Sequence, residues 1–197
     1  MPRPTLIVVD DPDRWPLDVP GVETVAARAY LAGGEYSALR RADVYNLCRS
    51  YRYQSLGYYV SLLATARGHR PLPGMTAIQD LKSQTILKIA ADELQEQVQK
   101  SLSALQSREF TLSVYFGRNV AKRYDHLAQQ LFTMFPAPLM RAGFVLCEKD
   151  GRGSLTSLRA ISANEVPDEH RDFVVEVAQE YLAGKRRRGE RKGGGRY

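Results

Sequence analysis

The stretch TLIVVDD (residues 5–11) is the part of this sequence that says most about the fold. Its five apolar or small residues precede two aspartates, a pattern typical of a first, buried strand. Three prolines then predict an extended connection, at positions Pro12, Pro16 and Pro20. The run is too short for a membrane span, which needs about 20 apolar residues, and the aspartates exclude the long apolar core of a signal peptide. We therefore expect a cytoplasmic protein.

Strand and helix patterns alternate after this first strand. We expect strands within VETVAARAYL (22–31) and at ADVYNLC (42–48), with a short helix over 36–41 between them. Apolar residues at Leu56, Val60 and Leu63 then recur at helical spacing, and this helix should end at Arg67-Gly68. The pair Thr76 and Gln79 fits a capping box, which would begin a long helix reaching about residue 105.

The second half of the chain repeats the alternation and then adds a hairpin. FTLSVYF (110–116) predicts a strand, GRN (117–119) a turn, and VAKRYDHLAQQLFTMF (120–135) an amphipathic helix. GFVLCEKDGRGSLTSLRAI (143–161) reads as a hairpin with its tip at Asp150-Gly151. A last helix should start at Pro167, because proline suits a first turn and the following acids suit the helix dipole.

This order predicts an α/β fold: a layered sandwich with a partly parallel sheet, helices packed on it and a C-terminal antiparallel hairpin. The length of 197 residues suits one domain, which we place at residues 1–184. The last segment, KRRRGERKGGGRY (185–197), is rich in glycine and arginine and has no means of burying a core. We expect it to be a disordered basic tail or linker.

The net charge of +6 comes from that tail and not from the body of the protein. Residues 185–197 contain seven of the 28 basic residues and one of the 22 acidic residues, which leaves 21 of each sign in the body. A nucleic-acid-binding domain would carry a basic surplus on its body. The tail alone would give weak, non-specific binding to polyanions, and nucleic-acid or ribosome binding through it remains an alternative function.

Metal and nucleophile motifs are not evident in the sequence. The two cysteines, Cys48 and Cys147, lie far apart at the ends of apolar runs, which favours buried thiols over a disulfide or zinc site. The three histidines are scattered, and we expect surface or capping roles for them. A small hydrolase or transferase is the alternative: it would pair Cys48 or Ser50 with Asp80, Lys82 or His170, although nothing in their spacing favours this.

Two basic junctions stand out, RSYRYQSLGYY (49–59) and FGRNVAKRY (116–124), each where an expected strand gives way to a helix. Cations in a first helical turn interact unfavourably with the helix dipole, so a negatively charged side chain or ligand should compensate them. If the strands are parallel, both junctions lie at the edge where open α/β sheets bind ligands. The sequence thus predicts a substrate- or anion-binding site. Its candidate residues are Arg49, Tyr51, Arg52, Tyr53, Gln54, Arg118, Asn119, Lys122 and Arg123.

A structural alternative stays open beside this site. Asp10 and Asp11 end the first strand and would lie within reach of Arg49 or Arg52, so the arginines could form internal ion pairs. Helical phase places Tyr59 in the core. Stacking of the tyrosines on nucleic-acid bases is a weaker option, because the body is neutral.

Four long segments resemble a known family. They are NLCRSYRYQSLGYYVSLLATARGHRPLP (46–73), TAIQDLKSQTILKI (76–89), FTLSVYFGRNVAKRYDHLAQQLFTMFPAPLMRA (110–142) and HRDFVVEVAQEYL (170–182). They resemble the N-terminal domain fused ahead of RimK-like ATP-grasp ligases, over roughly residues 4–183.

The resemblance implies an accessory α/β domain associated with an ATP-grasp ligase, not the ligase itself. Such a ligase activates a carboxylate as an acyl phosphate and transfers it to an amine, so ATP and magnesium are implied for the ligase module and no cofactor for this chain. The sequence ends at GGGRY, where a ligase portion would be expected to begin. We therefore expect the partner to be an ATP-grasp ligase domain or a separate ligase chain, and the ligand to be an acidic peptide or amino acid.

Overall fold

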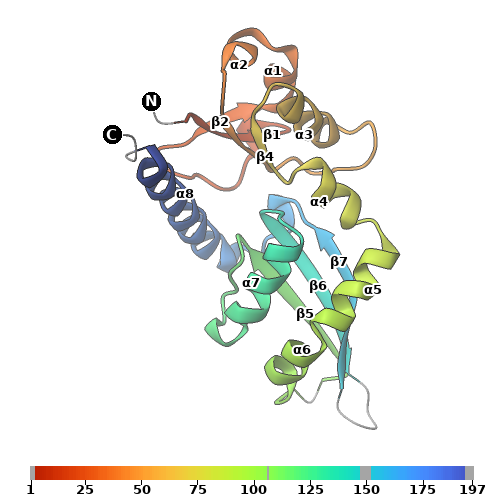
Figure 1. Ribbon diagram of the computed structural model, residues 1–197. Coiled ribbons are helices and arrows are strands. Elements are labelled where there is room, and N and C mark those ends of the chain that lie inside the picture. The colour runs from red at the N-terminus through yellow and green to blue at the C-terminus, as the bar shows by residue number, and fades with distance from the viewer. Residues whose placement is uncertain (1–2, 106, 147–151, 194–197) are drawn as a thin grey trace. The chain divides into compact units, whose positions relative to one another are not determined.

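The computed structural model describes residues 3–105, 107–146 and 152–193, with side chains as far as residue 184 (Figure 1). The chain divides into two compact units. The first unit consists of Met1–Leu72 and Ala163–Tyr197, and the second of Pro73–Ser162. The single domain over residues 1–184 stays a prediction.

The first unit is built on a four-stranded parallel sheet in the order β2-β1-β3-β4. Its strands are β1 (Thr5–Val9), β2 (Glu23–Ala26), β3 (Asp43–Asn46) and β4 (Arg70–Leu72). The apolar run predicted as the first strand is β1, which is central and pairs with both β2 and β3. Four of its five residues are buried, as expected for a strand covered on both faces.

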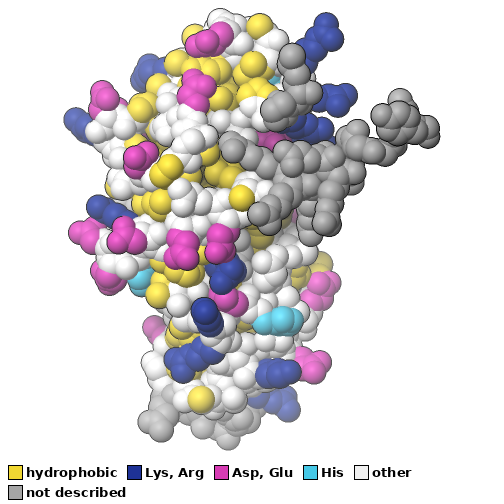
Figure 2. Space-filling model, turned by 90° about the vertical axis from the view of Figure 1, so that its left-hand side faces the viewer, with side chains coloured by type: hydrophobic (Ala, Val, Ile, Leu, Met, Phe, Trp, Pro, Cys, Tyr) yellow, Lys and Arg dark blue, Asp and Glu magenta, His cyan; other side chains and the backbone are white. Residues whose placement is uncertain are grey.

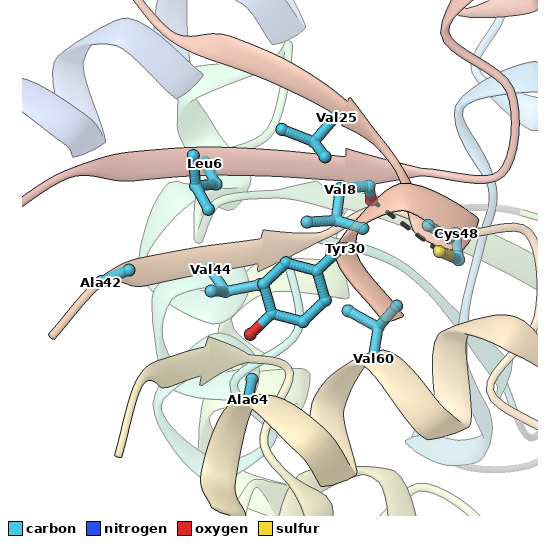
Figure 3. Packing of buried hydrophobic residues seen from close by; sticks show 10 residues of the cluster. Leu6, Val8, Val25, Tyr30, Ala42, Val44, Cys48, Val60 and Ala64 are labelled. Atoms are coloured by element: carbon cyan, nitrogen blue, oxygen red, sulfur yellow. Dashed lines mark hydrogen bonds between the residues drawn. The ribbon is translucent and has the colours of Figure 1, made fainter. Parts of the chain in front are cut away.

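Helices cover this sheet and close the core of the first unit. They are η1 (Pro12–Arg14), α1 (Ala27–Ala32), α2 (Gly34–Ala38), α3 (Leu56–Ala66), η3 (Ala163–Glu165), η4 (Asp168–His170) and α8 (Arg171–Gly193). Figure 3 shows Val8 and Val44 of the sheet facing Tyr30 of α1 and Val60 of α3. Each of these side chains is fully buried and contributes about 1.5–3 kcal/mol of apolar burial.

The second unit contains a separate, three-stranded antiparallel sheet in the order β5-β6-β7. Its elements are α4 (Met75–Asp80), α5 (Gln84–Glu93), α6 (Gln95–Leu102), β5 (Glu109–Tyr115), η2 (Lys122–Tyr124), α7 (Asp125–Met134), β6 (Leu139–Leu146) and β7 (Gly153–Ala160). Helices α5 and α6 contact β7, and α7 contacts β5. Gln95 and Gln99 both donate to the carbonyl oxygen of Gly153, which anchors α6 to β7.

The structure confirms the α/β class, the parallel sheet and the C-terminal hairpin, which is β6 and β7; its predicted tip lies outside the described residues. The strands form two sheets, however, because β5, β6 and β7 make up a sheet separate from the parallel one. The expected long helix is three helices, α4 to α6. The capping box was wrong: α4 begins after Gly74 with no side-chain cap, and Ser83 caps α5 by accepting from Ile86 N.

The last helix also differs from expectation. The backbone of α8 is helical as far as Gly193, although we expected a disordered tail from residue 185. Lysine, arginine and glutamate are good helix formers, so a run rich in them can prolong a helix that packing has already nucleated. The buried residues of α8 in the part with described side chains are Val174, Val177, Ala178 and Leu182. Residues 194–197 lie outside the described part of the chain.

Candidate anion-binding site

The order of the parallel sheet places a topological switch point at the carboxyl ends of β1 and β3. The connection that leaves β1 runs to β2 on one side, and the connection that leaves β3 runs to β4 on the other. Open α/β sheets bind ligands at such a switch point, because the two departing loops leave room between them. The loops here are Asp10-Asp11 after β1 and residues 47–55 after β3. The second of these carries the first predicted junction.

Hydrogen bonds tie the two loops together. The backbone N–H of Leu47 donates to the carbonyl oxygen of Val8 at 2.8 Å. The backbone N–H of Arg49 donates to Asp10 Oδ2 at 2.6 Å. Asp10 therefore holds the backbone of the second loop, and not the guanidinium group that the ion-pair alternative required.

A buried asparagine organises the start of the second loop. Asn46, the last residue of β3, is fully buried. Its Nδ2 donates to the carbonyl oxygen of Gly57 at 2.6 Å and to Ser61 Oγ at 2.8 Å, and its Oδ1 accepts from Cys48 N at 3.3 Å. One side chain thus fastens β3 to the first turns of α3 and fixes where the loop leaves the sheet.

The end of this loop is equally constrained. Ser55 caps α3 by accepting from Tyr58 N at 3.2 Å, and its hydroxyl donates to the carbonyl oxygen of Ser50 at 2.8 Å. Ser55 N donates to the carbonyl oxygen of Arg52 at 2.9 Å, which closes a turn over residues 52–55. Gln54 in this turn has a φ of 66°, whereas Tyr53 does not lie in the left-handed region, so the turn is type II. Glutamine is strained in that position.

The predicted residues of this first junction have two different roles. Tyr51 is structural, because its hydroxyl donates to the carbonyl oxygen of Asn46 at 2.6 Å. Burial, with the charges of Cys48 and Asp10 as smaller causes, raises the pKa of Tyr51 well above its ordinary value. Arg49, Arg52, Tyr53 and Gln54 are exposed on the outside of the same loop.

The two arginines of the junction carry the charge of the site. Among the described residues, no ion pair includes the side chain of Arg49 or Arg52. Asp11, the other proposed partner, is engaged by Arg14 at 3.6 Å and accepts from Asp13 N at 3.1 Å. The loop therefore presents two guanidinium groups beside a switch point, and guanidinium geometry suits carboxylates and phosphates.

Three tyrosines extend from this loop onto α3. Tyr53 is 71% exposed and meets Tyr58 edge to face, with 5.4 Å between ring centroids. Tyr58 meets Tyr59 in the same way at 5.6 Å. The placement of Tyr59 in the core was wrong, since it is 38% exposed. The buried face of α3 consists of Gly57, Val60, Ser61 and Ala64.

The second predicted junction belongs to the second unit and does not follow a parallel strand. Tyr115 and Arg118 exchange backbone hydrogen bonds of 2.8 and 2.9 Å around Phe116 and Gly117, whose φ values are 48° and 82°. Two positive φ values define a type I′ turn. The premise that both junctions share the edge of one parallel sheet was therefore wrong, because β5 is antiparallel to its neighbour.

The side chains of this second junction mostly hold the turn together. Arg118 Nε donates to Asp125 Oδ2 at 2.9 Å, and Asn119 N donates to Asp125 Oδ1 at 2.9 Å. Asn119 Nδ2 also donates to the carbonyl oxygen of Ser113 at 2.7 Å. Lys122 is exposed, and the exposed Arg123 lies over the ring of Tyr124 at 4.7 Å. The structural ion pair thus exists for Arg118, with a carboxylate that sequence reasoning had not considered.

The predicted cations lie only partly where the helix dipole would act on them. Helix α3 begins at Leu56, so Arg49 and Arg52 precede its first turn, and Arg118 lies in a turn before any helix. Lys122 and Arg123 lie in η2, the 3-10 turn directly before α7. The first turn of α7 contains an acid, Asp125, which the dipole favours. The case for an anion site rests instead on the switch point and on the exposed arginines of the first junction.

The candidate nucleophiles take part in local structure. Cys48 is buried, and its thiol contacts the carbonyl oxygen of Val8 at 3.8 Å (Figure 3). Burial, and secondarily the charge of Asp10, raises the pKa of this thiol, which keeps it protonated and unreactive. Ser50 Oγ accepts from Arg52 N at 3.2 Å within the loop. The second predicted cysteine, Cys147, lies outside the described residues.

The surface and composition set limits on other kinds of site. Figure 2 shows acidic and basic side chains interspersed over the face it displays, in agreement with a body of balanced charge. In the described part of the chain, histidine, cysteine and acidic residues form no group of three or more that could hold a metal ion. No described helix is both long and apolar enough to cross a bilayer.

Sequence reasoning missed the residues that shape the loop. Asn46 is a polar residue that interrupts the apolar run predicted as a strand, ADVYNLC (42–48), and that interruption was a usable signal. Ser55 precedes the apolar pattern of α3 directly and could have been read as its N-cap. Gly57 gave no signal in sequence, because its role depends on how closely Ser50 and Cys48 approach it.

Comparison with protein families adds the last observation. Residues 27–177 match the model of the RimK-like ATP-grasp N-terminal domain, and this range includes β3, the loop after it, α3 and the entire second unit. No curated protein matches the chain in sequence. The family match confirms the resemblance noted from the four long segments. The chain therefore belongs to the RimK-like ATP-grasp N-terminal domain family, a domain associated with RimK-like ATP-grasp proteins.

Proposed function

We propose that this chain is an accessory, substrate- or anion-binding domain that serves an ATP-grasp carboxylate–amine ligase in the cytoplasm. The ligase would be a further domain of the same polypeptide or a separate chain. The family match supports the association, since the domain is one found with RimK-like ATP-grasp proteins. ATP and magnesium would belong to the ligase module.

The observation that carries the proposal is the pair of exposed arginines on a rigid loop at the switch point. Arg49 and Arg52 project from a segment whose backbone is fixed at both ends, by Asn46 and by Ser55. A rigid loop loses little conformational entropy when it binds, which favours affinity. The ligand would be an oxyanion, either a carboxylate of an acidic amino acid or peptide or a phosphate ester.

The remaining predicted residues have secondary places in this proposal. Gln54 and Tyr53 adjoin Arg52 and would orient the ligand, while Tyr51 supports the loop from inside. Lys122 and Arg123 are exposed cations of the second unit and would bind an anion there, independently of the loop after β3. Arg118 and Asn119 would act only indirectly, through the turn that they stabilise with Asp125.

The test is a binding titration followed by isothermal calorimetry or by amide chemical shifts, with glutamate, a short glutamate peptide and inorganic phosphate as probes. Arg49→Ala and Arg52→Ala should each weaken binding about ten- to a hundredfold, because a lost charge-assisted contact is worth about 1.5–3 kcal/mol. Folding stability should change little. The matched control is Arg41→Ala, because Arg41 is exposed but precedes β3 and so lies toward the opposite edge of the sheet.

Two results would contradict the proposal. One is that none of the three probes binds the wild-type chain. The other is a large loss of stability in Arg52→Ala with unchanged ligand affinity, which would make the arginine structural.

A further inference from the structure

The most exposed large apolar side chain in the described part of the protein lies in the same turn as Arg52. Tyr53 is 71% exposed, and the next such residue, Ile89, is 49% exposed. A tyrosine ring in water loses the apolar burial that would otherwise stabilise the fold. Tyr53 lies beside the exposed Arg52 at the switch point, so a ligand bound to the arginine could also cover the tyrosine ring.

The ring of Tyr53 is held in place by the fold. It lies at the second position of the turn over residues 52–55, which the bond from Ser55 N to the Arg52 carbonyl closes at 2.9 Å. The ring meets Tyr58 of α3 with an interplanar angle of 72°, so an edge-to-face contact fixes its orientation while most of its surface stays in solvent. An ordered, exposed ring is a ready platform for a flat partner.

Strain in the backbone supports a functional reason for this turn. A type II turn favours glycine at its third position, and here the third position is Gln54 with a φ of 66°. A left-handed conformation at such a residue costs free energy, and strain of this kind concentrates at ligand-binding loops. The strained residue directly follows Tyr53 in the same turn.

We propose that the anion bound at Arg49 and Arg52 is joined to a flat aromatic ring, which stacks on Tyr53, and that the ligand class is a nucleoside monophosphate. The arginines bind the phosphate and Tyr53 binds the base. This inference rests on the proposed function, because the same site holds the anion. It adds the class of ligand bound by this domain, since an acidic amino acid or peptide without a ring would make no use of Tyr53.

The experiment compares three small probes: adenosine 5′-monophosphate, ribose 5-phosphate and adenosine. The first has phosphate and base, the second lacks the base, and the third lacks the phosphate. Wild-type protein should bind adenosine 5′-monophosphate at least about tenfold more tightly than ribose 5-phosphate, because stacking of one base on an aromatic side chain has about that effect. Adenosine should bind most weakly, since it lacks the anion.

Variants then assign the preference to particular side chains. Tyr53→Ala should bring the affinity ratio of the two phosphates close to one, and Tyr53→Phe should restore it because the ring is kept. Arg52→Ala should weaken both phosphates by the same factor and leave the ratio unchanged. Tyr59→Ala is the matched control, an exposed tyrosine of α3 outside the turn, and should keep the wild-type ratio. Circular dichroism on each variant confirms that the fold is intact.

The outcomes separate this inference from the proposed function. Equal wild-type affinities for adenosine 5′-monophosphate and ribose 5-phosphate would overturn the stacking and leave the anion site standing. If the wild-type protein binds neither of the two phosphates nor the carboxylate probes, the anion site is overturned and the inference with it. A change in sedimentation coefficient in Tyr53→Ala would show that the ring is covered by a second copy of the chain, which also overturns the inference.

Discussion

The side-chain amide of Asn46 donates to the carbonyl oxygen of Gly57 at 2.6 Å, from the end of β3 to the first turn of α3. Both residues are buried, and the loop that carries the exposed arginines lies between them in sequence. This single contact closes the loop at its base. The shape of the candidate site therefore depends on a residue that binds no ligand itself.

Replacing Asn46 with alanine should lower the free energy of unfolding by about 2–4 kcal/mol. The change leaves buried groups on Gly57, Ser61 and Cys48 without this partner, and an unsatisfied buried polar group costs about 1–3 kcal/mol. Urea denaturation measures the effect. The control is Asn164→Ala at an exposed position, where a change within about 0.5 kcal/mol is expected. Equal effects at the two asparagines would show that the Asn46 contacts contribute nothing.

Gly57→Ala should destabilise the protein by about 1–3 kcal/mol or more, although alanine normally favours a helix over glycine. A Cβ atom there would overlap the carbonyl oxygen of Ser50 and lie 2.9 Å from the Cβ of Cys48. Gly184→Ala provides the contrast, because a Cβ atom at that position of α8 would meet nothing within 4 Å. There the helix propensity should raise stability by about 0.5–1 kcal/mol. The melting temperatures of both variants test these two expectations. A Gly57→Ala variant that melts no lower than the wild type would mean that the loop can move away from the added Cβ atom.

Gln54→Gly should increase stability by up to about 1 kcal/mol while it weakens ligand binding. Glycine removes left-handed strain of about 1–2 kcal/mol, and part of that gain is offset by the greater entropy of the unfolded chain. Gln54→Ala is the matched variant, which shortens the side chain but keeps the strain. Chemical denaturation should order the three proteins with the glycine variant highest. A glycine variant less stable than the alanine variant would show that Gln54 is not strained.

Stability should fall at alkaline pH, and Tyr51 should account for part of the fall. Burial raises the pKa of Tyr51 above that of the unfolded chain, so its contribution is fully present below about pH 10 and is lost as pH rises through the folded value. In that window the group lowers the unfolding free energy by about 1.4 kcal/mol per pH unit. Burial, with the neighbouring Glu23 as a smaller cause, also raises the pKa of Tyr36, to about 12, so the decline has more than one source.

Tyr51→Phe separates the contribution of this tyrosine. The variant should be less stable near neutral pH, by about 1–3 kcal/mol, because the carbonyl of Asn46 loses its donor. Above pH 10 its stability should decline less steeply than that of the wild type. Unfolding free energies from pH 7 to 11.5 measure both effects. Parallel curves for the two proteins above pH 10 would mean that the Tyr51 hydroxyl ionises as easily in the folded state as in the unfolded state.

Deleting residues 185–197 should lower the melting temperature by no more than a few degrees. The segment offers little apolar surface, since only Tyr197 among its residues could bury much. The same deletion should abolish any binding of polyanions such as heparin at low salt, because the net charge of +6 lies in this segment. Differential scanning calorimetry and a heparin column test these two statements independently. A larger loss of stability would show that the end of α8 packs on the rest of the chain.

The sequence by itself determined the elements that depend on local patterns. The apolar run of β1 predicted a buried strand, because so apolar a segment is favourable only where its side chains are removed from water. Gly68, with a φ of 73°, follows α3 where a left-handed residue was expected, since glycine adopts that conformation without steric cost.

Only the tertiary structure decided which strands pair and which charges meet. The residues of β5 would suit a strand in either sheet, and its pairing with β6 comes from packing over long distances in sequence. Asp125 lies seven residues after Arg118, and the ion pair between them forms in the segment after the type I′ turn, where Asn119 N also donates to Asp125. The charges in a sequence show which residues could form ion pairs, whereas the backbone geometry decides which of these pairs form. For the same reason Asp10 binds the backbone N–H of Arg49 and leaves both guanidinium groups exposed at the switch point.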